Sequence, residues 1–230
     1  MKHFECNNAL SIYHKFKILK KILLIPAYSN VYNVEENMSN PVRLCLQNVT
    51  YHCYSRCIEK RNMLSPEHVK DLAADAINMA LEKYDFQVVH IEFVENHFHL
   101  LIRTTANGQT ISRIMQYIKA RITEKYNRVH DRTGTLWNER FSCKIVEQQD
   151  DPENYFLRLL WYIAYNPVRK RVVRDPRESN FGTIRAYLEK DFTPKVKITI
   201  HEYFNSLGNT FEERVKYLLE YEVLYRDKYT

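Results

Sequence analysis

Two histidines separated by one residue, His97 and His99, are the first candidates for chemistry in this sequence. They lie in segment 95–103, where apolar and polar residues alternate as they do in a β-strand. Because alternate side chains of a strand share a face, the two imidazoles would point the same way, with Cα atoms about 6.6–7 Å apart. Two imidazoles on one rigid face could bind one divalent metal ion. The alternative is that both are ordinary half-exposed strand residues.

Composition indicates one domain and leaves room for a polyanionic partner. The chain has 230 residues and 45% hydrophobic content, which is enough for a real core. Lys and Arg exceed Asp and Glu by 34 − 28 = 6, an excess that suits nucleic acid without requiring it. The 17 tyrosines could stack on unpaired bases, although most of them would serve to fill half-buried surfaces.

The cysteines and the apolar runs predict a cytoplasmic protein. Five cysteines are present, and none forms a Cys-x-x-Cys motif, which argues against a zinc ribbon. Cys53 and Cys57 are best explained as reduced thiols in a cytosol. The apolar run 22–25 is too short to span a membrane, and Pro26 follows it at once, unlike in a signal peptide. We therefore expect a soluble, cytoplasmic protein with no membrane partner.

Periodicity predicts elements in the order β-α-β-β-α-β-α. Ser65 and Pro66 indicate one helix start, Thr110 or Gln109 a second, and Asp151 a third, which would stop at Asn166 before Pro167. The apolar stripe expected on the second helix is Ile111, Ile114, Met115, Ile118 and Ile122. The expected strands are 49–56, 86–94 with Val89, Ile91 and Phe93 on one face, 97–103 and 142–147, and the expected helices are 65–84, 110–128 and 151–165.

This order predicts an α+β fold in which an antiparallel sheet has helices packed on one face. The other face would be free, and His97 and His99 would lie on it. We expect residues 1–40 to be a peripheral N-terminal extension and residues 41–190 to form the catalytic domain. Residues 191–230 would form a tail with two short helices, the second of them capped at Asn209 or Thr210.

Four motifs, in this order, resemble one protein family. They are Tyr-His-Cys-Tyr-Ser-Arg at 51–56, Asn-His-Phe-His-Leu-Leu at 96–101, Gly-Thr-Leu-Trp-Asn-Glu-Arg-Phe at 134–141 and Trp-Tyr-Ile-Ala-Tyr-Asn-Pro-Val at 161–168. Together they resemble the single-tyrosine HUH transposases, and most closely the branch of REP-associated tyrosine transposases. The resemblance covers residues 41–181, so both ends of the chain fall outside it.

The resemblance implies a ferredoxin- or RRM-like HUH fold and a specific reaction. Members of the family cut single-stranded DNA beside hairpins with a tyrosine nucleophile and a divalent metal, Mg²⁺ or Mn²⁺, held by the two histidines. They form a 5′-phosphotyrosine intermediate and can rejoin strands. Two departures stand out. The first forty residues are unexpected, and the loop after Arg56, usually rich in glycine, is Cys57-Ile58-Glu59-Lys60-Arg61 here.

Tyr162 is the candidate nucleophile. Helical geometry places it at the border of the apolar stripe of its helix, and its phenol, with a pKa near 10, would need activation by a metal, a base or a cation. Asn166, one turn later on the same face, could supply a third metal ligand. The alternatives are an ordinary boundary tyrosine, an Asn that caps the helix end, and nucleophiles at Tyr117 or Tyr126 on the preceding helix.

Several further side chains have expected roles around this site. Tyr165 should face solvent or another element, and His90 or Glu92 could orient a metal ligand. Trp137 either stacks on a base or braces the turn in which it lies. The basic side chains of the second helix are either solvated or in contact with phosphate. The expected DNA contacts are Arg56, Arg121, Arg128, Arg132, Trp137 and Arg140.

Two functions remain open from the sequence. The first is a metal-dependent single-stranded DNA endonuclease and strand transferase that acts near hairpins, either as a monomer or as a homodimer. The alternative is a catalytically inactive module of the same fold that binds hairpin DNA or RNA. A two-histidine phosphoesterase is disfavoured, because that chemistry calls for two His-x-Thr or His-x-Ser motifs and the sequence has neither.

Overall fold

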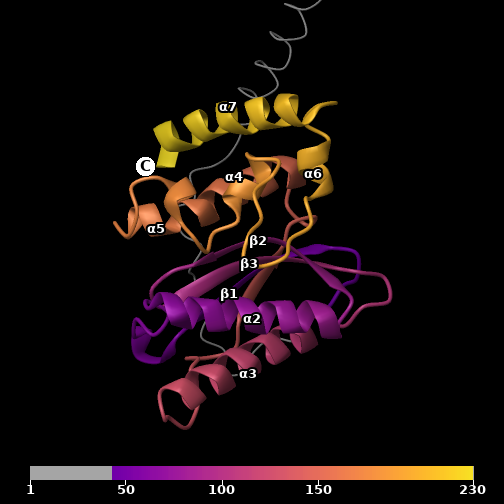
Figure 1. Cartoon of the computed structure of the whole chain (residues 1–230). Coiled ribbons are helices and arrows are strands. Elements are labelled where there is room, and N and C mark those ends of the chain that lie inside the picture. The colour runs from indigo at the N-terminus through magenta and orange to yellow at the C-terminus, as the bar shows by residue number, and fades with distance from the viewer. Residues whose placement is uncertain (1–42, 230) are drawn as a thin grey trace, which may run out of the picture. The chain divides into compact units, whose positions relative to one another are not determined.

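A four-stranded antiparallel sheet lies at the centre of the computed structural model, which describes residues 43–229 (Figure 1). The strands stand in the order β2-β3-β1-β4. Their bounds are β1 Thr50–Arg56, β2 Phe86–Phe93, β3 His97–Thr104 and β4 Ser142–Ile145. The predicted α+β class is confirmed, although β4 is shorter than expected.

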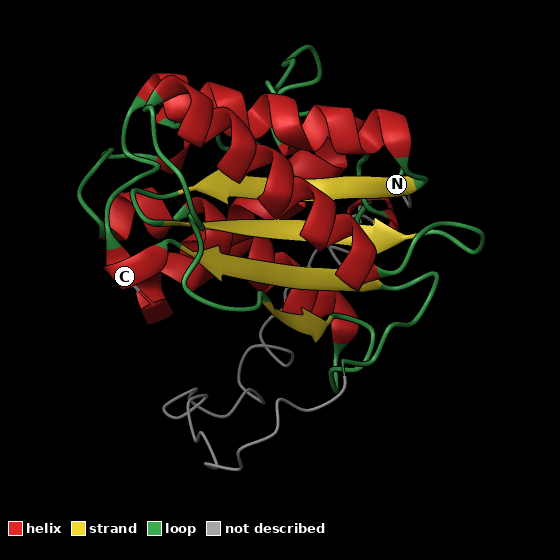
Figure 2. Ribbon diagram, turned by 90° about the horizontal axis from the view of Figure 1, so that it is seen from below, coloured by secondary structure: helices red, strands yellow, loops and turns green. Residues whose placement is uncertain are grey.

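Helices α2 (Glu67–Lys83) and α3 (Ile111–Val129) pack together on one face of the sheet (Figure 1, Figure 2). The predicted stripe of α3 is buried in full, because a helix with one apolar face must turn that face to the core. Thr110 caps α3, since its side chain accepts a hydrogen bond from the Arg113 backbone N–H. Ser65 does not cap α2, whose N-cap position is occupied by Pro66.

β2 contains a β-bulge that moves one side chain to a different face. Its pairing with β3 shifts between Val88 and His90, which leaves Val89 out of register. As a result Val88, Ile91 and Phe93 belong to the core between the sheet and its two helices. The prediction that Val89 shares that face was wrong, because a bulge adds one residue to a strand.

The other face of the sheet is covered by the C-terminal part of the chain (Figure 1). The covering elements are α4 (Pro152–Ala164), α5 (Asn166–Arg169), the 3₁₀ turns η2 (Pro176–Glu178) and η3 (Ile184–Tyr187), α6 (Glu202–Asn205) and α7 (Phe211–Tyr229). The expectation of a free face was therefore wrong: His97 and His99 are only 5% and 4% exposed. The reason is the strongly apolar face of α4, where Phe156, Leu160 and Ile163 need a surface to bury them.

α7 docks on α4 through buried polar contacts. The Trp161 indole N–H donates to the Leu218 carbonyl at 3.2 Å, and the Tyr165 hydroxyl donates to Glu222 Oε1 at 2.7 Å. Arg177 forms an ion pair with the same Glu222 carboxylate. Tyr165 thus faces another element, which was one of its two expected environments, and α7 is a long helix rather than a short one.

Helical structure continues past the predicted stop at Asn166. Tyr165 has helical dihedral angles and joins α4 to the short helix α5. Pro167 stands in the first turn of α5, where its missing N–H leaves no intrahelical hydrogen bond unmade. The prediction of an abrupt stop was wrong, because the proline opens a new turn, which carries Arg169.

Arg43–Thr230 cluster as one compact unit, and the predicted extension 1–40 lies outside the described residues. The predicted boundary at residue 190 stays a prediction. Within residues 43–229, no helix has the length and apolarity that crossing a bilayer requires.

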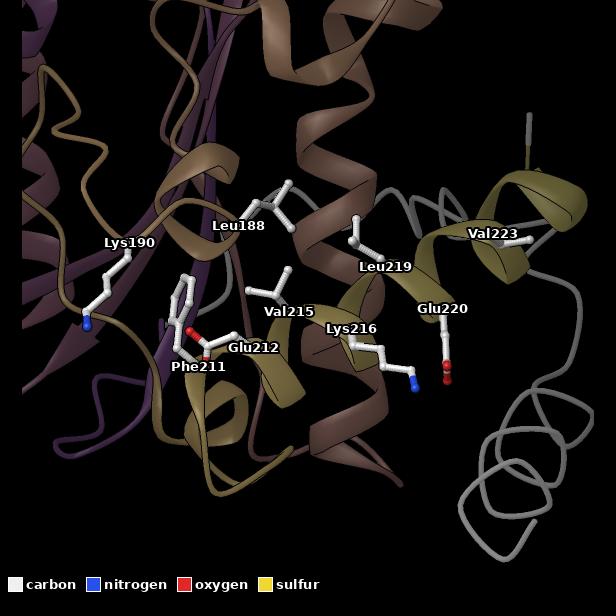
Figure 3. Close-up of a pocket in the computed structure, with 9 residues that line it drawn as sticks. All are labelled: Leu188, Lys190, Phe211, Glu212, Val215, Lys216, Leu219, Glu220 and Val223. Atoms are coloured by element: carbon white, nitrogen blue, oxygen red, sulfur yellow. The ribbon is translucent and has the colours of Figure 1, made fainter. Parts of the chain in front are cut away.

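A cavity of about 590 Å³ lies beside α7, lined among others by Leu188, Val215 and Leu219 (Figure 3). Its lining includes none of the residues predicted for chemistry.

Candidate active site

The predicted histidine pair lies on the sheet face that α4 and α5 cover. The register of β1 with β3 places Tyr54 beside His99 and Arg56 beside His97. The two imidazole centroids are 5.1 Å apart, and the Tyr54 ring lies 5.2 Å from one and 5.1 Å from the other. The two histidines therefore share one face, as strand alternation predicts.

A third histidine, His52 of β1, joins this pair. Its Nε2 lies 3.0 Å from His99 Nδ1, and the two rings stack with centroids 5.2 Å apart. The sequence analysis missed His52, although a signal was present. The alternation that puts Tyr54 and Arg56 on one face of β1 puts His52 there too.

Asn96 determines which nitrogen of the His97 ring carries the proton. Asn96 Nδ2 donates to the Lys60 backbone carbonyl at 3.0 Å, so its Oδ1 is the atom that faces His97 Nδ1, at 2.7 Å. Because an amide oxygen can only accept, His97 Nδ1 must be protonated. His97 Nε2 then keeps its lone pair, and this is the state a metal ligand needs.

The loop that holds Asn96 has an uncommon backbone. In η1 (Ile58–Lys60), Glu59 and Lys60 have φ values of 52° and 57°, a left-handed region that favours glycine. The loop thus adopts a glycine-like conformation without glycine, at a cost of about 1–2 kcal/mol per residue.

Burial keeps the histidine cluster neutral. It lowers the pKa of His52 and that of His97 to about 4 each, and it holds the pKa of His99 well below its ordinary value. A charged imidazole in this place would lose its hydration without gaining a carboxylate partner. All three rings are therefore neutral at pH 7, and neutral imidazole is the form that binds metal ions.

Positive charge surrounds the cluster. After burial, the charges that lower the three pKa values are those of cationic side chains and of the other imidazoles. The cations are Lys144 beside His52, Arg56 and Lys170 beside His97, and Arg169 beside His99. A site with this charge attracts an anion such as a phosphodiester.

Tyr162 of α4 lies over the histidines. Its ring meets His99 edge-on with centroids 5.6 Å apart and His52 with centroids 6.2 Å apart. The side chain is 39% exposed, as its predicted border position on α4 requires. The helix that carries it begins at Asp151, whose side chain accepts from the Asn154 N–H, so the predicted cap is confirmed.

Asn166 and Arg169 flank Tyr162 at the start and the end of α5. Asn166 Nδ2 donates to the Tyr162 carbonyl at 2.9 Å, so this side chain holds the helix end, as one of its two predicted roles requires. Its Oδ1 is the remaining atom that could bind a metal ion. The Arg169 guanidinium lies 4.9 Å from the centre of the Tyr162 ring, and the sequence analysis did not identify it.

The alternative nucleophiles lie across the sheet from the histidines. Tyr117 and Tyr126 belong to α3, which packs on the opposite face (Figure 1). Tyr117 packs edge-on against Tyr84 with centroids 5.3 Å apart, and Tyr126 lies against His130 at 4.2 Å. Neither ring shares a face of the sheet with His97.

Of the predicted DNA contacts, Arg56 lies beside the histidines, while Arg121 and Arg128 lie on α3. Both arginines of α3 form ion pairs with Glu124, at 2.6 and 3.3 Å. Arg140 is exposed just before β4. The two arginines of α3 lie across the sheet from Tyr162, so they could reach DNA only on the opposite face.

Two further predicted contacts hold the chain after α3. Arg132 Nη2 donates to the Thr135 carbonyl at 3.0 Å. Trp137 is 5% exposed, its indole N–H donates to the Lys119 carbonyl at 3.0 Å, and its ring packs edge-on against Phe98. A buried indole presents no face to a base, so the stacking role predicted for Trp137 was wrong and its bracing role holds.

His90 and Glu92 of β2 form their hydrogen bonds with the C-terminal part of the chain. His90 Nδ1 lies 2.8 Å from Thr183 Oγ1, and Ser179 Oγ donates to Glu92 Oε1 at 2.8 Å. Glu92 Oε2 has no partner among the described residues, and a Cβ on Gly182 would lie 2.1 Å from it. The expectation that either residue orients a metal ligand is therefore not met: both tie the sheet to its cover.

The donor set fits a divalent ion that brings part of its own coordination shell. Within residues 43–229, no group of three or more His, Cys, Asp or Glu side chains is arranged to hold a metal. His97 and His99 offer two neutral nitrogens on one rigid face. An ion such as Mg²⁺ or Mn²⁺ would complete its shell with oxygen, from Asn166, water or a substrate phosphate.

Residues 45–156 match the model of the IS200-like transposase family. This stretch contains all four strands of the sheet and the three clustered histidines. Over this stretch, which is just under half of the chain, the protein is similar to the IS200-like transposase family. The match ends before Tyr162, Asn166 and Arg169.

The chain is similar to REP-associated tyrosine transposases in particular. A curated Haemophilus influenzae protein of that name is 29% identical over 118 residues, which are 46% of this chain and 65% of the relative. The solved structure of a REP-associated tyrosine transposase bound to a REP hairpin aligns with a TM-score of 0.56 at 17% identity, over 70% of this chain and 92% of that chain. A Deinococcus radiodurans transposase structure aligns at 17% identity over 46% of this chain and 85% of that one, with a TM-score of 0.35, too low to support an argument.

Proposed function

We propose that the protein is a metal-dependent enzyme that nicks and rejoins single-stranded DNA beside a hairpin, with Tyr162 as the nucleophile. The observation that carries the proposal is the position of the Tyr162 ring, 5.6 Å from His99 and over a neutral, cation-ringed histidine cluster. We include the hairpin in the proposal because the chain is similar to a transposase whose solved structure is bound to a REP hairpin.

The proposed reaction is an attack of the phenolic oxygen on a phosphodiester. The Tyr162 Oη–P bond forms as the P–O3′ bond breaks, and the electron pair leaves with the 3′ oxygen. The phenolic proton passes to water, and the 3′ oxygen takes up a proton. The products are a 5′-phosphotyrosine and a free 3′ hydroxyl. Because the phosphoester is retained, attack by a 3′ hydroxyl reverses the step and joins strands without a nucleotide cofactor.

The residues around Tyr162 have separable roles in this proposal. His97 and His99 would hold a Mg²⁺ or Mn²⁺ ion, with Asn166 Oδ1 as a third ligand, and the ion would act as a Lewis acid on the scissile phosphate. Arg56 and Lys170 would contact phosphates beside the site, because both lie close enough to lower the pKa of His97. Arg121, Arg128, Arg132 and Arg140 would contact a more distant part of the DNA.

The test is a search for the covalent adduct. Purified protein is incubated with hairpin-bearing single-stranded DNA and Mn²⁺, and adducts are resolved by denaturing electrophoresis and mapped by mass spectrometry. We expect a phosphonucleotide on Tyr162, and no adduct from Tyr162→Phe, which keeps the ring and its packing. Binding should weaken steeply as salt rises, because phosphate contacts release counterions.

Tyr155→Phe is the matched control, since Tyr155 lies on the same side of α4, two turns earlier. It should form adduct at the wild-type rate. An adduct on another tyrosine would overturn the assignment of Tyr162. Intact hairpin binding with no adduct, across several hairpins and both metal ions, would instead support an inactive binding module.

A further inference from the structure

Arg169 is held in one orientation although it lies at the surface. Its Nη2 donates to the Tyr162 carbonyl at 2.6 Å, and its Nη1 donates to the Tyr225 hydroxyl at 2.8 Å. The guanidinium carbon lies 4.9 Å from the centre of the Tyr162 ring. An exposed arginine normally samples many rotamers, so two hydrogen bonds and a ring contact mark this one as ordered.

The hydrogen bonds of Arg169 leave donors for a ligand. A guanidinium has five N–H groups, and two of them serve Tyr162 and Tyr225. The other three have no acceptor among the described residues. The same guanidinium lies close enough to His99 to lower the pKa of that imidazole further, after burial. The guanidinium that carries these donors thus lies beside both the Tyr162 ring and His99.

Arg169 donates its second hydrogen bond to a residue of α7, and α7 is firmly docked. Tyr225 is 3% exposed, and its ring packs on Tyr165 with centroids 5.6 Å apart. Tyr165 in turn donates to Glu222, which forms the buried ion pair with Arg177. The position of the guanidinium is therefore set from the C-terminal helix, 56 residues beyond Arg169.

The geometry points to Arg169 as a further catalytic residue that binds the non-bridging oxygens of the scissile phosphate, and to Tyr225 of α7 as the positioning residue that holds it there. The inference rests on the proposed function. A planar guanidinium suits two oxygens of one phosphate, and negative charge grows on those oxygens as the phenolic oxygen attacks. The C-terminal helix is thereby part of the active site rather than an appendage.

The test compares single-turnover adduct formation with DNA affinity. For Arg169→Ala, at saturating hairpin DNA and Mn²⁺, we expect the rate of adduct formation to fall about 100-fold, as for the loss of one oxyanion donor. Hairpin affinity should change about threefold or less, since one phosphate contact is lost among several. Arg169→Lys keeps the charge but loses the forked donor set, so its rate should fall between the two.

Tyr225→Phe deletes only the hydroxyl that orients Arg169, and we expect a rate about tenfold lower with unchanged affinity. In the Arg169→Ala background the same substitution should have no further effect, because positioning residues act through their partner. Tyr221→Phe is the control: this hydroxyl of α7 is also buried and bonds to Asn154, so its loss should leave the rate unchanged. Arg174→Ala controls for the loss of one exposed charge.

The outcomes separate the two proposals. If wild-type protein forms no adduct, the proposed function falls and this inference falls with it. If the wild type reacts and a folded Arg169→Ala variant, or Arg169→Gln should the first not fold, reacts equally fast, the inference alone is overturned. Additive effects of Tyr225→Phe and Arg169→Ala would overturn the positioning role of Tyr225, because a merely structural hydroxyl would slow both backgrounds alike.

Discussion

The floor of the candidate site and its cover are built in different ways. We call floor the sheet face that carries His52, His97 and His99, and cover the elements α4 to α7, residues 152–229. The floor is fixed by strand register, where only a slip of the pairing could move a side chain to the other face. All of it lies within the family match, which stops at residue 156, near the start of α4.

The cover depends on side-chain contacts between segments far apart in the chain. Glu222 meets Arg177 across 45 residues, and Tyr225 meets Arg169 across 56. These contacts place Tyr162 and Arg169 over the histidines. In the proposed function, the histidine ligands of the metal lie in the floor and the nucleophile lies in the cover, so metal binding and nucleophilic attack can be damaged separately. Damage to the histidines of the floor should remove both functions, whereas loss of the Tyr162 hydroxyl from the cover should remove the attack while metal binding remains.

The largest expected effect separates the two bodies directly. His99→Ala removes a metal donor from the floor, so Mn²⁺ affinity should fall by at least about 100-fold, more than for loss of a residue that only orients a ligand. Tyr162→Phe should leave Mn²⁺ affinity unchanged. Both variants should lose adduct formation. Calorimetric titration with Mn²⁺ in the absence of DNA measures the difference.

His99→Ala should also cost about 1–3 kcal/mol of stability, since His52 loses its buried hydrogen-bond partner. Thermal denaturation checks that the variant is folded before metal is added. Equal losses of Mn²⁺ affinity in the two variants would contradict the division into floor and cover.

The second effect concerns the attachment of the cover. Glu222→Ala leaves Arg177 and the Tyr165 hydroxyl without their shared acceptor. Because the Arg177 side chain is 31% exposed, solvent offsets part of the loss, and we expect about 2–3 kcal/mol of destabilisation in urea unfolding. Glu212→Ala, at an exposed position of α7, should change stability by about 0.5 kcal/mol or less. A Glu222→Ala variant as stable as wild type would show that apolar packing alone holds α7.

Local patterns were enough to predict the floor. Alternation of period two gave the strands that carry the histidines, and a 3.6-residue period gave the buried stripe of α3. The same alternation also indicates the position of His52 in β1. A single histidine outside the His-x-His pair did not by itself predict a site residue. The β-bulge at Val89 had no such signal, because an extra residue in a strand is set by pairing rather than by composition.

The arrangement of the cover could not be predicted from local patterns. Residues 170–200 contain short 3₁₀ turns without an apolar period, so no sequence pattern predicts where these turns pack. The docking of α7 rests on a few polar pairs, such as Glu222 with Arg177, that become visible only once the segments meet. The half-exposed position of Tyr162 could be calculated from helical geometry, and the family resemblance singled it out as the candidate nucleophile. Arg169 was missed because the predicted stop at Asn166 ended the helix before it.

A third prediction concerns the orientation of the floor histidines. Asn96→Ala removes the acceptor that keeps the proton on His97 Nδ1. We expect Mn²⁺ affinity to fall about tenfold, as for other residues that orient a metal ligand. Asn78→Ala also removes an amide with two backbone partners, but far from the floor, and should leave Mn²⁺ affinity unchanged. Wild-type affinity in Asn96→Ala would mean that packing alone orients the ring.

The smallest effect comes from Glu92, at the seam between floor and cover. Burial raises the pKa of Glu92 to about 8, and its hydrogen bond to Ser179 and the charge of Lys70 offset only part of that shift. Between pH 4.5 and 8, the Glu92 carboxyl is therefore protonated in the folded state, whereas in the unfolded chain, with its ordinary pKa of 4.5, it is ionised. Stability is then highest below pH 4.5 as far as this group is concerned, and it falls as pH rises towards 8.

The histidines act in the opposite direction, and their pH window, from about 4 to 6.5, overlaps only the lower part of the Glu92 window. Burial lowers the pKa of His52 and His97 to about 4. Between pH 6.5 and 4 the unfolded chain therefore binds protons at these imidazoles that the folded state does not bind. Stability falls as the pH drops below 6.5 for this reason. Between pH 6.5 and 8 the Glu92 term dominates, with a slope of at most about 1.4 kcal/mol per pH unit for one proton. Glu92→Gln should flatten that slope, and it should make the fall of stability between pH 6.5 and 4.5 steeper, because the opposing contribution of Glu92 is lost there too. Urea unfolding at a series of pH values measures both limbs, and a slope above pH 6.5 that survives the substitution would show that Glu92 is ionised at the seam in the folded protein.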